Sequence, residues 1–426
     1  MSSSSLINRF LMVCLLSAYI FSFGFTFFPV ANTKQIIGVV GVLAFMLKCL
    51  KERSVRLSGI VLTSALWAIV FSVWCYFSMV ANNTDDMSYA SYILSFAIWL
   101  GGAYGVISLM RVQHGRASLS LFSQYFAAIC VAQCILAILI DRIEGFQIFV
   151  DTYIGQGQDF LHRVHRMYGI GASLDTAGIK FSAALIMIAH QIGTDKSVTG
   201  KKWRLALNLI CYAIITICGN MISRTTTVGA VMGLAYMGLM IGVVRRGMVT
   251  VRQIRFYVML VVVTAAFVVT AILLYRSNPE FRHDLRFGFE SFFNYFESGS
   301  FRSSSTDKLN STMWMWPTDT RSWIIGTGIF GNFVYSTDIG YCRFVLYCGL
   351  IGMAIFSGYF IYNGLAVSRK FKNYALMSVM MISLSFVIWL KVATDLFLFN
   401  AILFCLDGDY DEDGNEIETD TMLETQ

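Results

Sequence analysis

Charged residues and prolines are scarce in this sequence. Only 14% of the 426 residues are Asp, Glu, Lys or Arg, whereas 56% are hydrophobic. Soluble domains have roughly a quarter of their residues charged, so a soluble fold of this composition would lack the polar side chains that cover a surface. The three prolines are Pro29, Pro279 and Pro317, so the apolar segments contain few helix breakers. These scarcities exclude a soluble protein and predict a helical membrane protein.

Cysteine motifs and nucleic-acid-binding patterns are also missing. The ten cysteines, from Cys14 to Cys405, lie in or at the ends of apolar segments, and none forms a CxxC motif. We expect buried, reduced cysteines there rather than disulfides or a metal site. All Lys and Arg residues precede residue 407, and the segment 407–426 contains nine acids. We therefore expect an acidic, disordered cytoplasmic tail after a basic body, which suits an anionic lipid or substrate.

Apolar segments long enough to cross a membrane follow one another along residues 1–406. A spanning helix needs about 20 apolar residues. The segment 375–406 is too long for one upright helix and is interrupted at 391–395, so two helices are favoured there, with one helix as the alternative. The predicted fold is an all-α, polytopic membrane helix bundle of about 12 (11–12) transmembrane helices in a single integral membrane domain, 1–406. The first span is an uncleaved helix, and the spans are 9–30, 35–50, 57–80, 88–110, 118–140, 173–192, 205–221, 225–244, 256–275, 338–362 and two within 375–406.

The distribution of basic residues predicts the orientation. With the N-terminus inside, the basic connections fall in the cytoplasm and the short outer connections contain few basic residues, as the positive-inside rule requires. Two long extracytoplasmic loops, about 141–172 and 276–337, then lie outside, and long connections are usually functional. Within the second, the aromatic spacing of 281–296 suits a helix at the membrane interface, or else a packed loop helix with solvated arginines. The basic connections are 48–56, 111–116, 196–204, 245–255 and 369–372.

Arginines near the outer ends of these spans are candidates for chemistry, because charges beside a membrane are costly and usually functional. Arg224 lies in a polar break between two apolar runs, where its planar guanidinium group suits a phosphate. The alternative is an arginine that merely reaches the membrane interface. Arg163 and Arg166 precede the span 173–192 and form either a second cationic contact or a basic surface.

Asp338 and Arg343 lie at the start of the span 338–362. A carboxylate at this position suits a general base that activates a hydroxyl group. As a helix N-cap, Asp338 has a structural role instead, and the two roles are compatible. Arg343 is either a phosphate ligand or an internal counter-ion.

Four motifs follow one another in the second half of the chain. RMYGIG at 166–171 precedes a short span, and SRTTTVGAVMGL at 223–234 opens a later one. A large outer loop ends in WPTDTRSWIIGTGIFG at 316–331, and the next span begins with TDIGYCRFVLYCGLIG at 337–352. In order and content these motifs resemble the bacterial O-antigen polymerase and ligase superfamily (the Wzy type). The resemblance covers roughly residues 160 to 365, and the earlier spans match only as generic membrane helices.

The resemblance implies a glycosyltransferase that polymerises a polysaccharide such as O antigen, capsule or exopolysaccharide. Such an enzyme transfers a glycan linked to a polyprenyl diphosphate, such as undecaprenyl diphosphate, to a hydroxyl group of an acceptor repeat unit. It works at the outer face of the bacterial inner membrane, without a cofactor or metal. Its partners are the lipid-linked oligosaccharide, membrane lipid, a flippase and a chain-length regulator, and no nucleic acid. The expected catalytic residues are Asp338 and Arg224, and the expected substrate-binding residues are Arg166, Arg163, Arg343, Arg286 and Arg321.

Two other functions remain open at this point. One is an O-antigen ligase of the same superfamily, which makes lipopolysaccharide. Ligases tend to place a histidine at the end of the large loop, where this chain has Asp338, and this difference favours a polymerase. The other is a lipid-linked oligosaccharide flippase or transporter. Transporters often have repeated halves, and the sequence has no evident internal repeat.

Overall fold

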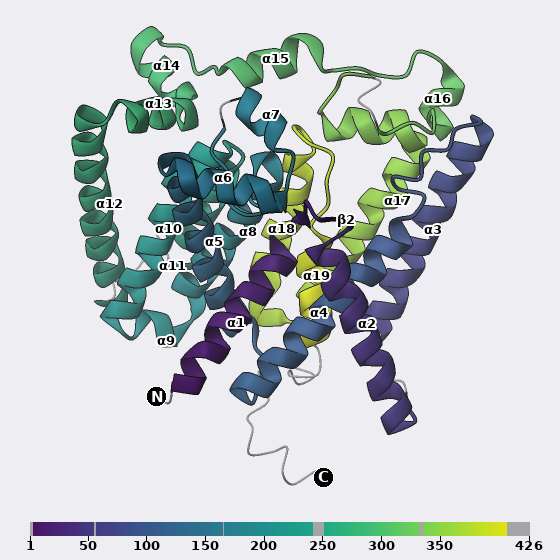
Figure 1. The fold of residues 1–426 in the computed structure, drawn as a ribbon, viewed down its shortest axis with the longest axis horizontal. Coiled ribbons are helices and arrows are strands. Elements are labelled where there is room, and N and C mark those ends of the chain that lie inside the picture. The colour runs from purple at the N-terminus through teal and green to yellow at the C-terminus, as the bar shows by residue number, and fades with distance from the viewer. Residues whose placement is uncertain (1–2, 55–56, 165, 242–250, 332–334, 407–426) are drawn as a thin grey trace. The chain divides into compact units, whose positions relative to one another are not determined.

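The computed structural model describes residues 3–54, 57–164, 166–241, 251–331 and 335–406, and the fold over these ranges is almost entirely α-helical (Figure 1). The predicted tail, 407–426, and part of the predicted connection 245–255 lie outside the described residues. Seven helices of the described chain are long and apolar enough to cross a membrane, so this is an α-helical membrane protein. They are α2 (Thr33–Glu52), α3 (Gly59–Ala81), α4 (Tyr92–His114), α5 (Leu119–Arg142), α10 (Lys202–Ile222), α12 (Val251–Ser277) and α17 (Gly340–Lys370).

Five further helices occupy the other predicted spans, or parts of them. Two of them divide the segment 375–406, as expected from the polar interruption at 391–395. That all twelve helices cross the membrane stays a prediction. The five are α1 (Ser3–Ile20), α8 (Leu174–Thr194), α11 (Thr226–Ile241), α18 (Ala375–Ile388) and α19 (Phe397–Leu406). Short helices connect the rest: α6 (Glu144–Tyr153), α7 (Gln158–Arg163), α9 (Lys196–Thr199), α13 (Pro279–Gly288), α14 (Glu290–Ser298), α15 (Ser304–Thr312), α16 (Thr320–Ile325) and η1 (Lys372–Tyr374).

The prediction of one helix over 9–30 is wrong in its second half. The helix ends at Ile20, and strands β1 (Gly24–Phe25) and β2 (Phe28–Asn32) follow. With β3 (Ile154–Gly155) they form a small antiparallel sheet in the order β2-β1-β3. Pro29 has no N–H group to continue a helix, and the strand ladder pairs the backbone groups that the helix would have paired.

The single helix predicted over 281–296 is likewise two helices. Asn278 caps α13 through hydrogen bonds from the N–H groups of Glu280 and Phe281, both 3.0 Å long, and Pro279 occupies the first turn. The chain then leaves helical geometry at Phe289, where α14 begins. A capped start and an early stop limit α13 to ten residues.

The chain divides into two compact units. Unit 1 comprises residues 1–15, 33–119 and 304–426, and unit 2 comprises 16–32 and 120–303. The long segment 276–337 is therefore shared, because α13 and α14 belong to unit 2 whereas α15 and α16 belong to unit 1. The single domain expected over 1–406 stays a prediction.

The core of unit 1 is aromatic. The ring of Phe356 stacks on Phe71 at 4.3 Å and on Trp389 at 5.6 Å between centroids. Such pairs each stabilise a fold by about 0.5–1.5 kcal/mol beyond the area that they bury. Helix α17 is kinked at Gly349, whose φ of 67° and contact with the backbone of Ile324 in α16 exclude a side chain.

The core of unit 2 is built around α8. From Ala177 to Gly193 every residue except Lys180 is buried, as expected for a helix that is apolar on all sides. Helix α11 approaches α8 at Gly229, where a Cβ atom would overlap the backbone of Ser182. This close approach brings the start of α11 against the first turns of α8, and the candidate site lies there.

Candidate functional site

Arg224 lies in the break between α10 and α11, and α8 holds this break in place. Asp175, in the first turn of α8, accepts hydrogen bonds from the hydroxyl groups of Ser223 (3.1 Å) and Thr225 (2.6 Å). The hydroxyl group of Ser182 donates to the carbonyl oxygen of Thr225 at 2.9 Å. The residues on both sides of Arg224 are therefore tied to one buried helix, which fixes the point from which its side chain extends.

The side chain of Arg224 reaches α13 and α14. Its Nε donates to the carbonyl oxygen of Phe287 at 2.9 Å, and its Nη2 lies 2.5 Å from a carboxylate oxygen of Glu290. The guanidinium carbon lies 4.1 Å from the centroid of the Phe287 ring, a cation–π distance. Burial lowers the pKa of Arg224, and the charge of Glu290 opposes this shift. An arginine remains protonated throughout the physiological range, so the site keeps this positive charge.

Arg166, between α7 and α8, meets the same ring. Its guanidinium carbon also lies 4.1 Å from the centroid of Phe287. Burial lowers the pKa of Arg166, the positive charge of Arg224 lowers it further, and Asp175 and Glu290 oppose both. Arg166 and Arg224, the arginine pair, thus sit close enough to repel each other on one aromatic support. Two fixed guanidinium groups of this kind are suited to an anion with several oxygen atoms.

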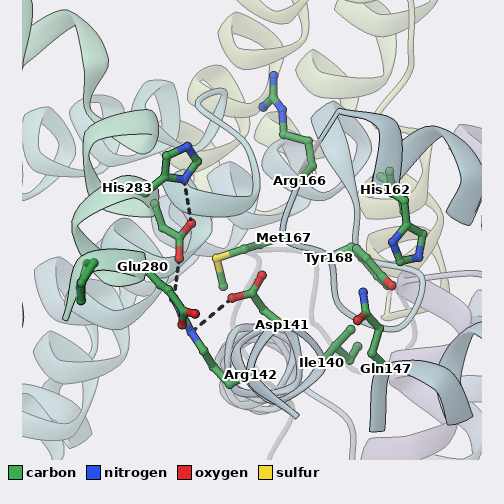
Figure 2. A pocket seen from close by; sticks show the side chains of 13 residues that line it. Ile140, Asp141, Arg142, Gln147, His162, Arg166, Met167, Tyr168, Glu280 and His283 are labelled. Atoms are coloured by element: carbon green, nitrogen blue, oxygen red, sulfur yellow. Dashed lines mark hydrogen bonds and ion pairs between the residues drawn. The ribbon is translucent and has the colours of Figure 1, made fainter. Parts of the chain in front are cut away.

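A pocket of about 590 Å³, the charged pocket, has Arg166 in its wall. The end of α5, residues of α6 and α7, the segment around Met167 and the first half of α13 form the other walls, and Figure 2 shows their side chains. Arg142 is directed toward Asp141, at 3.2 Å, toward Asp284, at 2.6 Å, and toward Glu280. The lining therefore combines several carboxylates with guanidinium and imidazole groups, and this lining is suited to a polar ligand rich in hydroxyl groups.

One wall of the charged pocket contains a histidine oriented by a carboxylate. The Nε2 atom of His162 lies 2.8 Å from Asp151, and the hydroxyl group of Tyr168 donates to the same carboxylate at 2.9 Å. Burial, together with the Asp151 contact, raises the pKa of Tyr168 to about 12, so Tyr168 remains a donor. An imidazole with one nitrogen on a fixed carboxylate has its other nitrogen available to accept a proton, which is the arrangement of a general base.

Two other predicted substrate residues of unit 2 lie outside this constellation. Arg163 ends α7 and is exposed. Arg286 is exposed on α13, where it forms an ion pair with Glu297 at 2.8 Å and lies over the ring of Phe293. The bond to Glu297 raises the pKa of Arg286. The structure therefore brings Arg166 and Arg224 together and leaves Arg163 and Arg286 at the surface.

The remaining predicted residues belong to unit 1. Asp338 is half-buried two residues before α17, and the N-cap position of that helix is occupied by Ile339 without a side-chain bond. The N-cap alternative for Asp338 is therefore wrong. Arg343 donates to the carbonyl oxygen of Phe330 at 2.7 Å, and its guanidinium carbon lies 3.8 Å from that ring's centroid. The negative charges of Asp338 and Asp86 both favour the charged form of Arg343.

Asp86 fixes the glycine-rich end of the predicted outer loop. Its carboxylate accepts the N–H groups of Phe330 (2.7 Å) and Gly331 (2.6 Å), together with the hydroxyl group of Ser88. Burial raises the pKa of Asp86, but the hydrogen bonds from Gly331, Ser88 and Phe330 outweigh it and leave the pKa below its usual value. Arg321, on α16, is exposed and donates to the carbonyl oxygen of Ala81.

Sequence reasoning identified both members of the arginine pair and missed their supports. Asp175, Phe287 and Glu290 carry no local signal, because an acid before an apolar helix and an aromatic residue in an aromatic-rich segment are both common. The two predicted catalytic residues, Arg224 and Asp338, fall in different units.

In comparisons with known proteins, no family model, no curated protein and no solved structure matches the chain. The function has to be argued from the site itself.

Proposed function

We propose that this membrane protein is a glycosyltransferase of the O-antigen polymerase type. It transfers a glycan from a polyprenyl diphosphate to a hydroxyl group of an acceptor repeat unit at the outer face of the bacterial inner membrane. The observation that carries the proposal is the arginine pair, two guanidinium groups at 4.1 Å from the same phenyl ring.

The arginine pair suits the leaving group of this reaction. When the bond between the sugar and the diphosphate breaks, negative charge develops on the phosphate oxygen atoms. Fixed cations aimed at that charge lower the barrier, because they need no reorganisation during the reaction. Each planar guanidinium group is able to bind two oxygen atoms, which a lysine cannot do. Arg166 and Arg224 would hold the diphosphate, and Asp175 would keep Arg224 in place.

The charged pocket lies beside the arginine pair, because Arg166 belongs to both. We place the sugar residues of the substrate in this pocket, whose carboxylates and donors match sugar hydroxyl groups. A base must then remove the proton of the acceptor hydroxyl group while its oxygen forms the new bond to the sugar carbon. Asp338 is the base that follows from the sequence, and His162, held by Asp151, is the base that the geometry of unit 2 favours.

The finer topology is part of the proposal. We propose twelve membrane helices, with the N-terminus inside and both 141–172 and 276–337 outside. The arginine pair and the charged pocket come from these two outer segments and from the outer end of α10, so this orientation places them together on the outer side. The basic connections at 48–56 and 369–372 fall on the opposite side, which agrees with the positive-inside rule.

The test compares variants that keep the charge. Arg224→Lys and Arg166→Lys should each lower polymer formation on the order of 10²-fold, the usual cost of losing one group that stabilises developing charge. Arg302→Lys, an exposed position in the same unit, is the matched control. Surface-glycan length is measured in cells that lack the native protein and carry each variant at equal membrane abundance. Binding of undecaprenyl diphosphate is measured on the purified protein in lipid nanodiscs.

The same cells separate the alternative functions. Loss of a polymerase leaves acceptors with a single repeat unit. Loss of a ligase leaves long chains on the lipid carrier, and loss of a flippase leaves the lipid-linked unit on the inner face. Ladders of ordinary length from both lysine variants would exclude the arginine pair as the donor site.

A further inference from the structure

A second cavity lies in unit 1, and none of its lining residues belongs to the arginine pair or the charged pocket. It has a volume of about 590 Å³ and is lined by residues of α2, α3, α4 and α19 and of the segment just before α3. Its walls are mainly apolar and include Val42, Phe45, Val61, Phe96, Leu100 and Phe404. We call it the apolar cavity. A volume of this size is in the range of small-molecule and cofactor sites.

Polar groups line one end of the apolar cavity. Lys48 comes from the last turns of α2, Arg111 from the last turn of α4, and Ser58 from the position before α3. The polar groups therefore come from the C-terminal ends of α2 and α4 and from the start of α3, which lie together at one end of the cavity. Among the described residues that line the cavity, the charged ones are both cations and none is an acid. This end of the cavity favours an anion.

The hydroxyl group of Ser58 supports the same conclusion. Its oxygen is shielded from solvent and has no hydrogen-bond partner among the described residues, and it does not cap α3. Buried polar atoms are normally paired, so an unpaired one requires an explanation. A ligand oxygen at this end of the cavity would supply the missing partner.

The two cations are placed differently. A guanidinium nitrogen of Arg111 donates to the carbonyl oxygen of Cys405 at 2.5 Å, which anchors the group in the cavity wall. Lys48 lies 3.9 Å from Glu52, and both side chains are more than half exposed. Exposed pairs of this kind contribute about 0–1 kcal/mol, so Lys48 is able to exchange Glu52 for a ligand. One fixed cation and one weakly paired cation thus lie at the same end.

We propose that the apolar cavity binds one anionic phospholipid from the surrounding membrane. Its phosphate lies against Lys48, Ser58 and Arg111, and the first part of an acyl chain lies along the apolar walls. Basic pockets between membrane helices bind anionic headgroups in this way. A free phosphate would leave the apolar walls unfilled, and a zwitterionic lipid carries no net negative charge to match this basic end. In the orientation proposed above, this end faces the cytoplasm, but the lipid site does not depend on that function.

The test measures lipid binding and not activity. The full-length protein is purified in detergent, and native mass spectrometry counts the phosphatidylglycerol and phosphatidylcholine molecules retained as free lipid is titrated. We expect one phosphatidylglycerol to bind more tightly than any phosphatidylcholine. In the double variant Lys48→Gln, Arg111→Gln its affinity should fall on the order of 30-fold, since each cation near a lipid headgroup contributes about a factor of five. Lys51→Gln, Arg369→Gln removes two exposed charges outside the cavity and should have no effect.

A second variant keeps the charges and fills the space. Ala97 lines the apolar cavity, and Ala97→Phe should displace the lipid while Lys48 and Arg111 remain. This variant decides the matter if the charge variant does not fold. Equal retention of the two lipids, or loss in the control equal to loss in the cavity variants, would overturn the proposal. Displacement of the lipid by millimolar inorganic phosphate alone would overturn it too, in favour of a simple anion site.

Discussion

Each unit holds arginine against the ring of a phenylalanine, but the surroundings differ. In unit 2, the guanidinium groups of Arg166 and Arg224 share the ring of Phe287. In unit 1, Arg343 lies over the ring of Phe330, and the negative charges of two carboxylates, Asp86 and Asp338, attract its guanidinium group. Carboxylates attract the cations in both units, because Glu290 and Asp175 act on the arginine pair, so the difference is the second guanidinium group on the ring of Phe287. Two cations on one ring repel each other, and this repulsion is relieved when an anion joins them.

The comparison separates two uses of the same contact. Aromatic support fixes a guanidinium group in both units, so the support itself does not indicate a ligand. The number of cations on one ring does indicate a ligand, because unit 2 places two guanidinium groups on Phe287 and these repel each other. We infer that the arginine pair serves a ligand and that Arg343 stabilises the packing of the segment around Phe330. The expected role of Arg343 as a substrate contact stays a prediction.

The largest effect is expected for the acceptor base, because unit 1 offers Asp338 and unit 2 offers His162. Asp338→Asn and His162→Gln keep polar groups of similar size but accept no proton. The substitution that removes the base should lower polymer formation by roughly 10²–10⁴-fold at unchanged abundance, and the other should have little effect. Glycan ladder length and protein level are measured in the same cells. Ordinary ladders from both variants would reject both bases and leave the donor site standing.

A second test exchanges Arg343 and Arg224 for lysine in parallel. Arg343→Lys should lower the free energy of unfolding by about 1–3 kcal/mol, because it loses a charge-assisted bond to the carbonyl group of Phe330, and should leave binding of undecaprenyl diphosphate unchanged. Arg224→Lys should weaken that binding at least about tenfold. Thermal unfolding and ligand titration are measured in the same nanodiscs. Weakened binding with unchanged stability for Arg343→Lys would reverse the comparison.

A third test uses pH to measure how much the hydrogen-bonded carboxylate of Asp86 stabilises unit 1. Hydrogen bonds leave the pKa of Asp86 below its usual value in the folded state. Its carboxylate therefore stabilises the fold above the unfolded-state pKa, about 3.9, and this stabilisation is lost as the pH falls through the lower folded-state pKa. Asp86→Asn should lower Tm at pH 7 and should reduce the drop in Tm between pH 5 and pH 3. Parallel Tm curves for the two proteins would show that Asp86 contributes nothing to this acid sensitivity.

The smallest effect concerns Glu290, which competes with a diphosphate for Arg224. Glu290→Gln removes the charge of the ion pair and keeps the size of the side chain. Undecaprenyl diphosphate should then bind about threefold more tightly, the size expected for a partly exposed ion pair of roughly 0.5–1 kcal/mol. Glu297→Gln, which breaks the exposed pair with Arg286, is the control. Weaker binding in Glu290→Gln would mean that Glu290 positions Arg224 instead of competing for it.

The positions of most helices could be predicted. The first helix was predicted to continue to residue 30 but ends at Ile20, and this error has a physical reason. Helix α3 covers Gly59–Ala81 against a prediction of 57–80, because a long apolar run in a membrane protein pairs its backbone groups most simply as a helix. The segment 24–32 is also rich in apolar residues, yet it forms the two strands β1 and β2, and β1 pairs with Ile154–Gly155. Hydropathy does not distinguish a short apolar strand from the end of a helix, and the strand partner lies more than a hundred residues away.

The membrane class, the helical character and the candidate arginines were determined by the sequence alone, because composition and apolar length are properties of each segment by itself. The supports of those arginines were decided only by the tertiary structure. Arg224 and the carbonyl group of Phe287 are 63 residues apart along the chain, and nothing in either segment specifies the other. Their contact exists because the close packing of α8 and α11, at Gly229 and Ser182, sets where Arg224 begins. The capped start and early end of α13 set where Phe287 lies.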